Sequence, residues 1–273
     1  FLAVVFLTMG WLAVLSMMFG RSIDGLTALV SGGEAAPLGP KVMVAAIGAI
    51  PLTWFIVAKG PTSIKFFNMV ISPALVLLMG WMMYLILSHH SFGELMGMKA
   101  LAPPFEDNTL NFIIAVEVNL AAGFSWWPYI GNLGRLTKNE RTAFWPNIVG
   151  IFGAAALGEV VGLLGSVALG NSDPTIWMAQ VGGVTVGVIA LGFVAFANVT
   201  SMANILYTSV VGLRQIGTSA IRGLRWDVLL FLFCIVPLIL VIFYPTMYDG
   251  FFIFLVWTSA LNSALAGIGI ADY

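Results

Sequence analysis

Eight long apolar segments, joined by short polar connections, constrain this chain more than any other feature of its sequence. Each segment has about the 20 mostly apolar residues that a helix needs to cross a bilayer. Barrel-type alternation is absent, and the segments are too long for barrel strands. The sequence therefore predicts an all-α membrane protein with about eight transmembrane helices. We place these at residues 1–20, 40–58, 64–88, 109–131, 144–170, 180–211, 227–245 and 249–271.

The composition excludes a water-soluble domain. Of the 273 residues, 8% are charged and 60% are hydrophobic, whereas a soluble domain carries about 25% charged residues. The net charge of −1 gives no basis for binding nucleic acid. The single cysteine, Cys234, cannot form a disulfide within the chain. We therefore expect a monomeric, multi-pass protein of the cell membrane (plasma or inner membrane), with the lipid bilayer as a partner and no nucleic acid bound.

Lysine and arginine are shared unevenly between alternate connections. One set holds only three of them, Arg21, Lys41 and Lys99. The other set holds eight, namely Lys59, Lys65, Arg135, Lys138, Arg141, Arg214, Arg222 and Arg225. Because connections rich in lysine and arginine stay in the cytoplasm, we predict that the eight-charge side is cytoplasmic.

The fourth segment contains a predicted break, in "GFSWWPY" at residues 123–129. Gly123 and Pro128 flank Trp126 and Trp127, and Pro128 cannot donate to the helical hydrogen-bond ladder. Interrupted spans are tolerated where they border a cavity, and they often indicate a transporter binding site. Trp126 or Trp127 would then stack on a flat ligand ring. The alternative is a kinked helix whose tryptophans serve packing or an interfacial belt.

The sixth segment carries four polar residues within seven positions, in "NVTSMAN" at residues 198–204. Asn198, Ser201 and Asn204 are spaced by three and share a helical face. The amide of Asn204 suits an amide or imide edge, and Thr200, Ser201 and Asn198 suit a hard cation such as sodium. The alternative is hydrogen bonding between helices. In the last segment, Asn262 and Ser263 stand among small residues, a pattern that indicates close helix packing.

Two carboxylic acids, Glu117 and Glu159, lie within apolar segments. An ionisable group inside the bilayer costs about 2.5–3.5 kcal/mol or more, so it is a functional candidate by default. Either residue could carry a proton or balance the charge of a coupling ion. We assign coupling to Glu117 because it lies nearer the predicted break. The alternative is a carboxyl held among small neighbours near a helix end.

Three motifs resemble the nucleobase:cation symporter-1 family, whose members import cytosine, purines, uracil, allantoin, hydantoins or thiamine. "NLGRLTKNER" at residues 132–141 is similar to the family signature "DFTRYAKS" after the sixth helix. "AGIGIADY" at residues 266–273 is similar to "AGVMIADYY" at the end of the tenth helix. Gly10 and Trp11 match the start of "GWxGxQ" in the third helix.

The resemblance implies a LeuT-like fold of two inverted five-helix repeats. The eight segments would then be family helices three to ten, with residues 1–88 ending the first repeat and residues 109–273 belonging to the second. We accordingly expect residues 1–273 to be a single transmembrane domain. We also expect this domain to be a fragment that lacks the first two and the last helices of a longer chain.

The resemblance also implies which residues bind the substrate. A tryptophan of the third helix and an aromatic residue of the sixth helix would stack on its two faces, and an asparagine of the eighth helix would hold its polar edge. Leu15 replaces the third-helix glutamine of the family and Asn132 replaces the signature aspartate, so the substrate stays open. The implied substrate residues are Trp11, one or more of Phe124, Trp126 and Trp127, and Asn204.

The sequence thus predicts a secondary active transporter rather than an enzyme. It would import a planar nucleobase-like heterocycle, such as a purine, pyrimidine, allantoin or hydantoin, by symport with Na⁺ or H⁺ and without another cofactor. One alternative is an amino-acid or amine symporter on the same scaffold. A second is an intramembrane enzyme that uses Glu117 and Glu159 as its acid and base.

Overall fold

The computed structural model of this chain describes residues 2–36, 38–99, 101 and 103–272. Phe1 and Tyr273, the ends of the first segment and of "AGIGIADY", lie outside the described residues. The helices are α1 (Leu2–Ser31), α2 (Pro40–Ala58), α3 (Pro61–His89), α4 (Phe92–Gly97), α5 (Asn108–Phe124), α6 (Trp127–Gly134), α7 (Glu140–Asn147), α8 (Ala155–Leu169), α9 (Pro174–Val181), α10 (Gly183–Ile216), α11 (Ser219–Gly223), α12 (Trp226–Phe243) and α13 (Phe251–Ala271). A π-helical stretch, η1 (Ile148–Ala154), joins α7 to α8, and a 3-10 turn, η2 (Pro245–Tyr248), precedes α13.

Eight helical stretches in the described part of the chain are long and apolar enough to cross a membrane. Two of them are composite, because α5 and α6 together form the span Asn108–Gly134, and α7, η1 and α8 form the span Glu140–Leu169. The short helices α4, α9 and α11 lie in the connections. For the residues that the structure describes, the prediction of an all-helical protein with eight helices long and apolar enough to cross a membrane is confirmed, and the LeuT-like arrangement of two repeats stays a prediction.

Local sequence chemistry fixes most helix ends. Proline stands at the first position of α2, α3 and α9, where its missing N–H group costs no hydrogen bond. The side chain of Asp107 accepts a hydrogen bond from the Thr109 N–H at 2.7 Å and begins α5. Gly170, at φ 66°, ends α8 in the left-handed conformation.

The first predicted segment, residues 1–20, is too short. Helix α1 continues past Arg21 and Asp24 to Ser31, although both residues are charged and nearly fully buried. Arg21 forms ion pairs with Asp173 at 3.2 Å and with Asp249 at 3.1 Å, and Asp24 accepts a hydrogen bond from the Ala36 N–H at 2.7 Å. Because these partners compensate the charges inside the protein, the helix does not have to end there.

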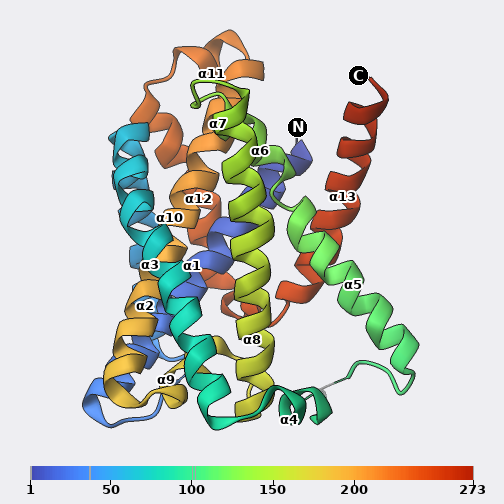
Figure 1. The fold of residues 1–273 in the computed structure, drawn as a ribbon. Helices are drawn as coiled ribbons and strands as arrows, with labels where there is room; N and C mark the ends of the chain where they lie inside the picture. The colour runs from blue at the N-terminus through green and yellow to red at the C-terminus, as the bar shows by residue number, and fades with distance from the viewer. Residues whose placement is uncertain (1, 37, 100, 102, 273) are drawn as a thin grey trace.

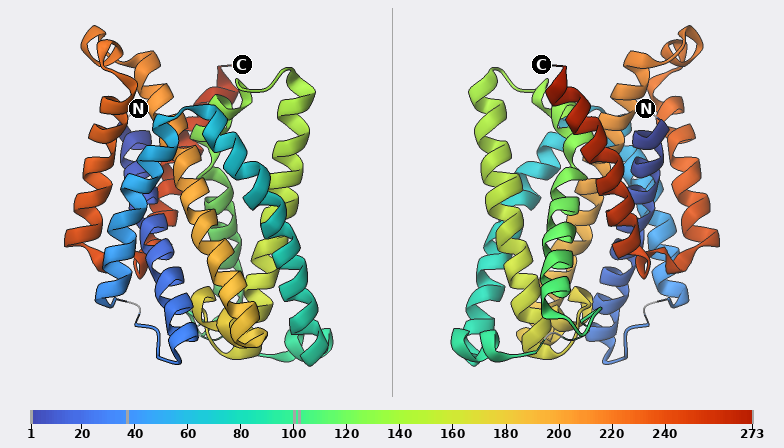
Figure 2. Two further views of the ribbon diagram at one scale, coloured as in Figure 1. Left: turned by 90° about the vertical axis from the view of Figure 1, so that its left-hand side faces the viewer. Right: turned by 90° about the vertical axis from the view of Figure 1, so that its right-hand side faces the viewer.

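Helix α1 lies at the centre of the bundle. It packs mainly against α10, α2 and α12. In its most apolar stretch 61% is buried inside the protein, the largest share among the eight spans. In Figures 1 and 2, α1 lies alongside α2, α10 and α12. The span made by α5 and α6 is the least buried, at 11%, and α5 stands apart at the edge of the bundle (Figure 1). It contacts α13 but makes little contact with α8.

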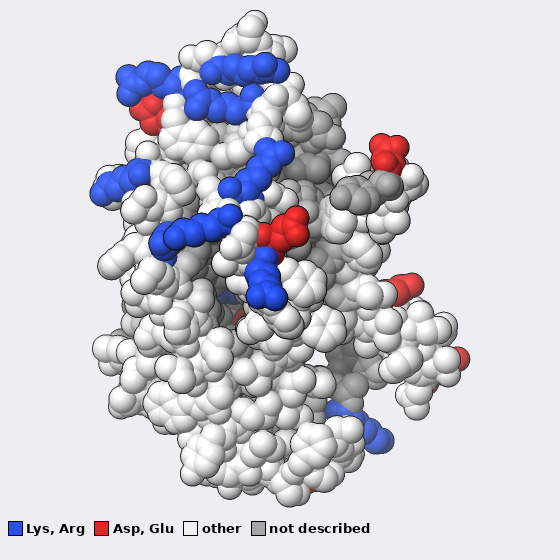
Figure 3. Space-filling view, turned by 45° about the horizontal axis from the view of Figure 1, so that its top comes forward, with Lys and Arg blue, Asp and Glu red and all other residues white. Residues whose placement is uncertain are grey.

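The basic residues of the predicted cytoplasmic side gather at one end of the bundle. The connections that hold them, between α2 and α3, between α6 and α7 and around α11, all lie at the top of Figure 1. The same end is strongly basic in the space-filling view of Figure 3.

A polar cluster around Arg21 joins three elements away from that basic end. Besides its two ion pairs, the Arg21 guanidinium lies 4.0 Å from the centre of the Tyr248 ring. Burial raises the pKa of Tyr248 to about 12. The cluster ties α1 to Asp173, the N-cap of α9, and to Tyr248 and Asp249 at the end of η2.

Candidate functional site

The predicted break in "GFSWWPY" is present. Helix α5 ends at Phe124 and α6 begins at Trp127, with Ser125 and Trp126 in a turn between them. The Trp126 N–H donates to the Gly123 carbonyl, three residues back rather than four, at 3.2 Å. Pro128 has no N–H to continue the α-helical ladder. Ser125 and Trp126 keep right-handed helical dihedral angles, with φ of −62° and −85°, so a tight turn interrupts the α-helix here without unwinding the chain.

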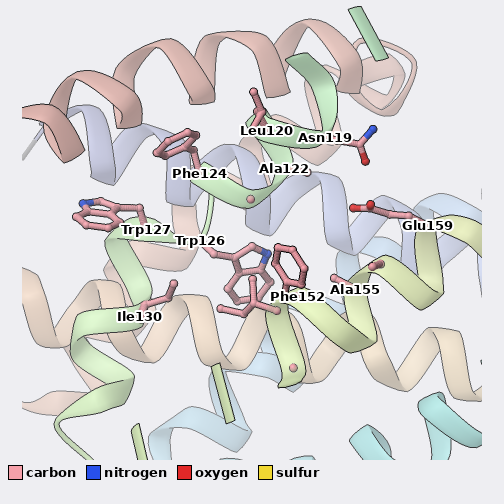
Figure 4. Close-up of a pocket in the computed structure, with 14 residues that line it drawn as sticks. Asn119, Leu120, Ala122, Phe124, Trp126, Trp127, Ile130, Phe152, Ala155 and Glu159 are labelled. Atoms are coloured by element: carbon pink, nitrogen blue, oxygen red, sulfur yellow. The ribbon is translucent and has the colours of Figure 1, made fainter. Parts of the chain in front are cut away.

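A cleft of about 810 Å³ borders this break, which is within the usual 300–1,000 Å³ of small-molecule sites. The α5–α6 span forms one wall, and η1 with α8 forms the other (Figure 4). The lining residues are Asn119, Leu120, Ala122, Gly123, Phe124, Trp126, Trp127 and Ile130 on the first wall, and Gly150, Ile151, Phe152, Ala155, Ala156 and Glu159 on the second.

Aromatic and polar groups occupy different parts of the cleft. Phe124 and Trp127 lie toward one end, Trp126 and Phe152 lie in the middle, and Asn119 and Glu159 lie at the other end (Figure 4). The Asn119 amide donates to the Ala115 carbonyl of its own helix at 2.7 Å. Among the lining residues, Glu159 is the only one with an ionisable side chain.

The second wall begins with the π-helical stretch η1. It follows Pro146 and contains Gly150 and Gly153, residues that weaken the α-helical ladder. π-Helical turns within α-helices occur frequently at functional sites. Both spans that line the cleft are therefore irregular where they face each other.

The structure separates the predicted substrate residues into two groups. Phe124, Trp126 and Trp127 line the cleft, whereas Trp11 and Asn204 are not among its lining residues. The Trp11 ring packs edge-on against Phe251 and Phe254 of α13, with ring centres 5.3 and 5.7 Å apart.

A buried hydroxyl cluster nevertheless links the elements that carry these residues. The Thr8 hydroxyl is hydrogen-bonded to the Tyr129 hydroxyl at 3.1 Å and to the Ser209 hydroxyl at 2.8 Å. Tyr129 also packs edge-on against Trp126, with ring centres 6.2 Å apart. These hydrogen bonds join α1, α6 and α10. Thr8 lies one turn before Trp11 on α1, and Ser209 follows Asn204 on α10.

The predicted coupling residues lie on α10 and α5, and none of them lines the cleft. The Asn198 amide donates to the Val194 carbonyl and the Thr200 hydroxyl donates to the Ala197 carbonyl, both at 2.9 Å. Ser201 is half-buried on the same helix, and Glu117 is exposed on α5. Among the residues that the structure describes, no three acidic, histidine or cysteine side chains gather closely enough to hold a metal ion.

Three features of the site do not follow from the sequence. Phe152 is one apolar residue in a long apolar run, and Glu159 is one of two acids that the sequence weighs equally. Asn68 is a lone asparagine in α3, yet it pairs with Asn204. The shared irregularity of the two walls, with Pro128 in one and Pro146 in the other, is the signal that points to the cleft.

Comparison of the chain with protein-family models and with curated proteins finds no match. The likeness to the nucleobase:cation symporter-1 family therefore rests on the three motifs quoted above. It remains a prediction.

Proposed function

We propose that this chain is the membrane domain of a secondary active transporter that imports a planar, nucleobase-like heterocycle together with Na⁺ or H⁺ across the cell membrane. The observation that carries the proposal is the break between α5 and α6, which borders a cleft lined by four aromatic rings. Transporter binding sites commonly lie beside spans that are interrupted by glycine and proline, as Gly123 and Pro128 interrupt this one.

The lining of the cleft suits a flat, largely apolar ligand. Phe124, Trp126, Trp127 and Phe152 offer ring faces and edges, and stacking on each ring is worth about 0.5–1.5 kcal/mol beyond burial. Asn119 and Glu159 offer polar contacts at one end. This combination of an apolar lining with a few polar groups is typical of small-molecule sites.

The packing of the bundle supports a moving wall. The α5–α6 span is the least buried of the eight and is held mainly by α13 and α10. The other wall, α8, packs against α3 and α9. Because the two walls are attached to different helices, they can rock against each other around the ligand, as alternating access requires.

An organic-amine symporter is the second candidate, and Glu159 is the observation that favours it. A carboxylate at one end of an aromatic cleft provides both an ion-pair partner and cation–π surfaces for an ammonium group. The two candidates predict different roles for Glu159, because a neutral heterocycle needs no countercharge.

Counterflow in proteoliposomes tests the proposal. We expect uptake of radiolabelled uracil or hydantoin by the wild-type protein, and faster net uptake with an inward Na⁺ or H⁺ gradient. Trp126→Ala should weaken apparent affinity by about 2- to 10-fold, the equivalent of one lost stacking contact. Trp145→Ala is the matched control, because Trp145 is an exposed tryptophan on α7 outside the cleft.

Three further variants test the alternatives. Glu159→Gln should leave heterocycle uptake largely intact and abolish uptake of an organic amine. Trp11→Ala and Asn204→Ala test the residues that the family resemblance implies. If Trp126→Ala behaves like Trp145→Ala, and neither Trp11→Ala nor Asn204→Ala changes uptake, the site is misplaced.

A further inference from the structure

Glu159 is an isolated carboxyl group in apolar surroundings. It is the only charged residue of α8, and its side chain lies at one end of the cleft (Figure 4). It forms no ion pair or hydrogen bond with any residue that the structure describes. Ionisable residues in such positions within a membrane span commonly belong to proton relays or ion pathways.

No other titratable side chain lines the cleft. Helix α8 packs against α3, α4, α9 and η1, while α5 and α6 form the facing wall. Helix α9 and the stretch η1 contain no titratable residue. The titratable residues of the other elements are Lys65, Tyr84, His89, Glu94, Glu117 and Tyr129. Since none of these lines the cleft, Glu159 is the one group there that can exchange a proton.

Glu159 also lies at the end of the cleft that is farther from the basic end of the bundle. Both walls run away from the α6–α7 connection, which lies at the basic end (Figure 1). The lining residues extend from Ile130 back to Asn119 on the first wall, and from Gly150 on to Glu159 on the second. Asn119 and Glu159 are therefore nearest the predicted external side. A proton that enters from outside would meet Glu159 before the aromatic rings.

We propose that Glu159 couples transport to protons. Its carboxylate binds a proton from the external side when the substrate enters the cleft, and the resulting carboxylic acid releases that proton to the cytoplasm after the walls have rocked. Only the O–H bond of the carboxyl group forms and breaks. This inference rests on the proposed transport function, and it moves the coupling role from Glu117, which is exposed on α5 and does not line the cleft.

The lining of the cleft suits a proton better than a metal cation. Hard metal cations such as Ca²⁺ and Mg²⁺ are held by about six or more oxygen ligands. The side chains that line the cleft supply oxygen atoms only from Asn119 and Glu159. A proton needs a single carboxylate, and this leaves the aromatic rings free to hold a planar substrate.

Proteoliposomes that contain the purified full-length protein separate coupling from binding, with radiolabelled uracil and hydantoin as probes. Counterflow at equal pH measures exchange, which needs no net movement of protons. Accumulation driven by an acidic exterior, and acidification of the lumen after uracil is added, measure coupling. We expect the wild type to show all three. Glu159→Gln should keep counterflow, as expected above, and lose both accumulation and acidification, because glutamine cannot carry the proton.

Two variants serve as references for Glu159→Gln. Glu159→Asp should restore acidification of the lumen, because it keeps a carboxyl group at the same position. Glu140→Gln is the matched control and should behave like the wild type, because Glu140 is an exposed acid on α7 outside the cleft.

Several results would overturn the inference and leave the transport function standing. One is acidification of the lumen by Glu159→Gln, or its loss in Glu117→Gln alone. Another is wild-type accumulation that follows a Na⁺ gradient at equal pH without acidification. If Glu159→Gln loses counterflow while Glu159→Asp keeps it, the carboxylate holds the substrate itself and the inference is wrong. If the wild type exchanges neither probe, the transport function and this inference both fall.

Discussion

Polar side chains within the apolar helices of this protein differ mainly in whether they have a hydrogen-bond or ion-pair partner from another part of the chain. Arg21 has two aspartates and a tyrosine ring around it. Asn68 and Asn204 are hydrogen-bonded to each other. Asn262, on α13, is completely buried, yet its amide nitrogen and oxygen have no hydrogen-bond partner among the described residues. Leaving a buried polar group unpaired costs about 1–3 kcal/mol.

We therefore expect Asn262→Leu to stabilise the protein. Leucine has a similar volume and needs no hydrogen bond, so the substitution should raise the free energy of unfolding by about 1–3 kcal/mol. Thermal unfolding in detergent measures the change. Ser263→Ala is the control and should change little, because Ser263 is exposed and bonds only to the Ala260 carbonyl of its own helix. A loss of stability in Asn262→Leu would show that the amide is paired in the folded protein.

Whole elements here are shaped by small and irregular residues. The break at Ser125 and Trp126 and the π-helical η1 bend the two walls of the cleft. Close contact between α8 and α9 depends on Gly165, because a Cβ atom there would lie 2.8 Å from the Trp177 ring. Trp177 is itself 1% exposed and cannot move aside. Gly162, one turn earlier on α8, faces open space.

This contrast predicts opposite effects of the same substitution on one helix. Gly165→Ala should destabilise the protein by about 1–3 kcal/mol, because the new methyl group overpacks the contact with Trp177. Gly162→Ala should be neutral or stabilise by up to about 1 kcal/mol, because alanine is the better helix former. Thermal unfolding of the two variants side by side measures both effects. Equal changes in stability for the two variants would mean that α9 does not pack on α8 as described.

At the scale of the molecule, charge is distributed asymmetrically between the two ends of the bundle (Figure 3). One end carries the eight lysines and arginines from the connections between α2 and α3, between α6 and α7 and around α11. Since positively charged connections are retained in the cytoplasm, we expect this end of the bundle to face the cytoplasm.

Cysteine labelling tests the orientation. The sequence has one cysteine, Cys234, which is buried, so Cys234→Ala provides a background free of cysteine. In that background, Ala35→Cys lies in the α1–α2 connection and Leu136→Cys in the α6–α7 connection, and both positions are exposed. A membrane-impermeant maleimide should label Ala35→Cys in intact cells, and Leu136→Cys only after permeabilisation. The reverse pattern would invert the topology.

The sequence predicts the spans and the break because both depend on consecutive residues. The length of an apolar run decides whether a helix can cross the bilayer, and Pro128 lacks its N–H group wherever the helix lies. The same reasoning from neighbouring residues predicts that the first span ends at residue 20, before the charged Arg21. This prediction is wrong, because α1 continues to Ser31. A charged residue ends a membrane helix only if it has no partner inside the protein.

Those partners come from tertiary structure alone. Arg21 meets Asp173 and Asp249, which are 152 and 228 residues away in the chain, and Asn204 meets Asn68 across 136 residues. Phe152 and Glu159 become a wall of the cleft because η1 and α8 lie opposite the broken span. Hydropathy and helix-breaking chemistry belong to neighbours in the sequence, whereas pairing and cavities depend on how the helices pack.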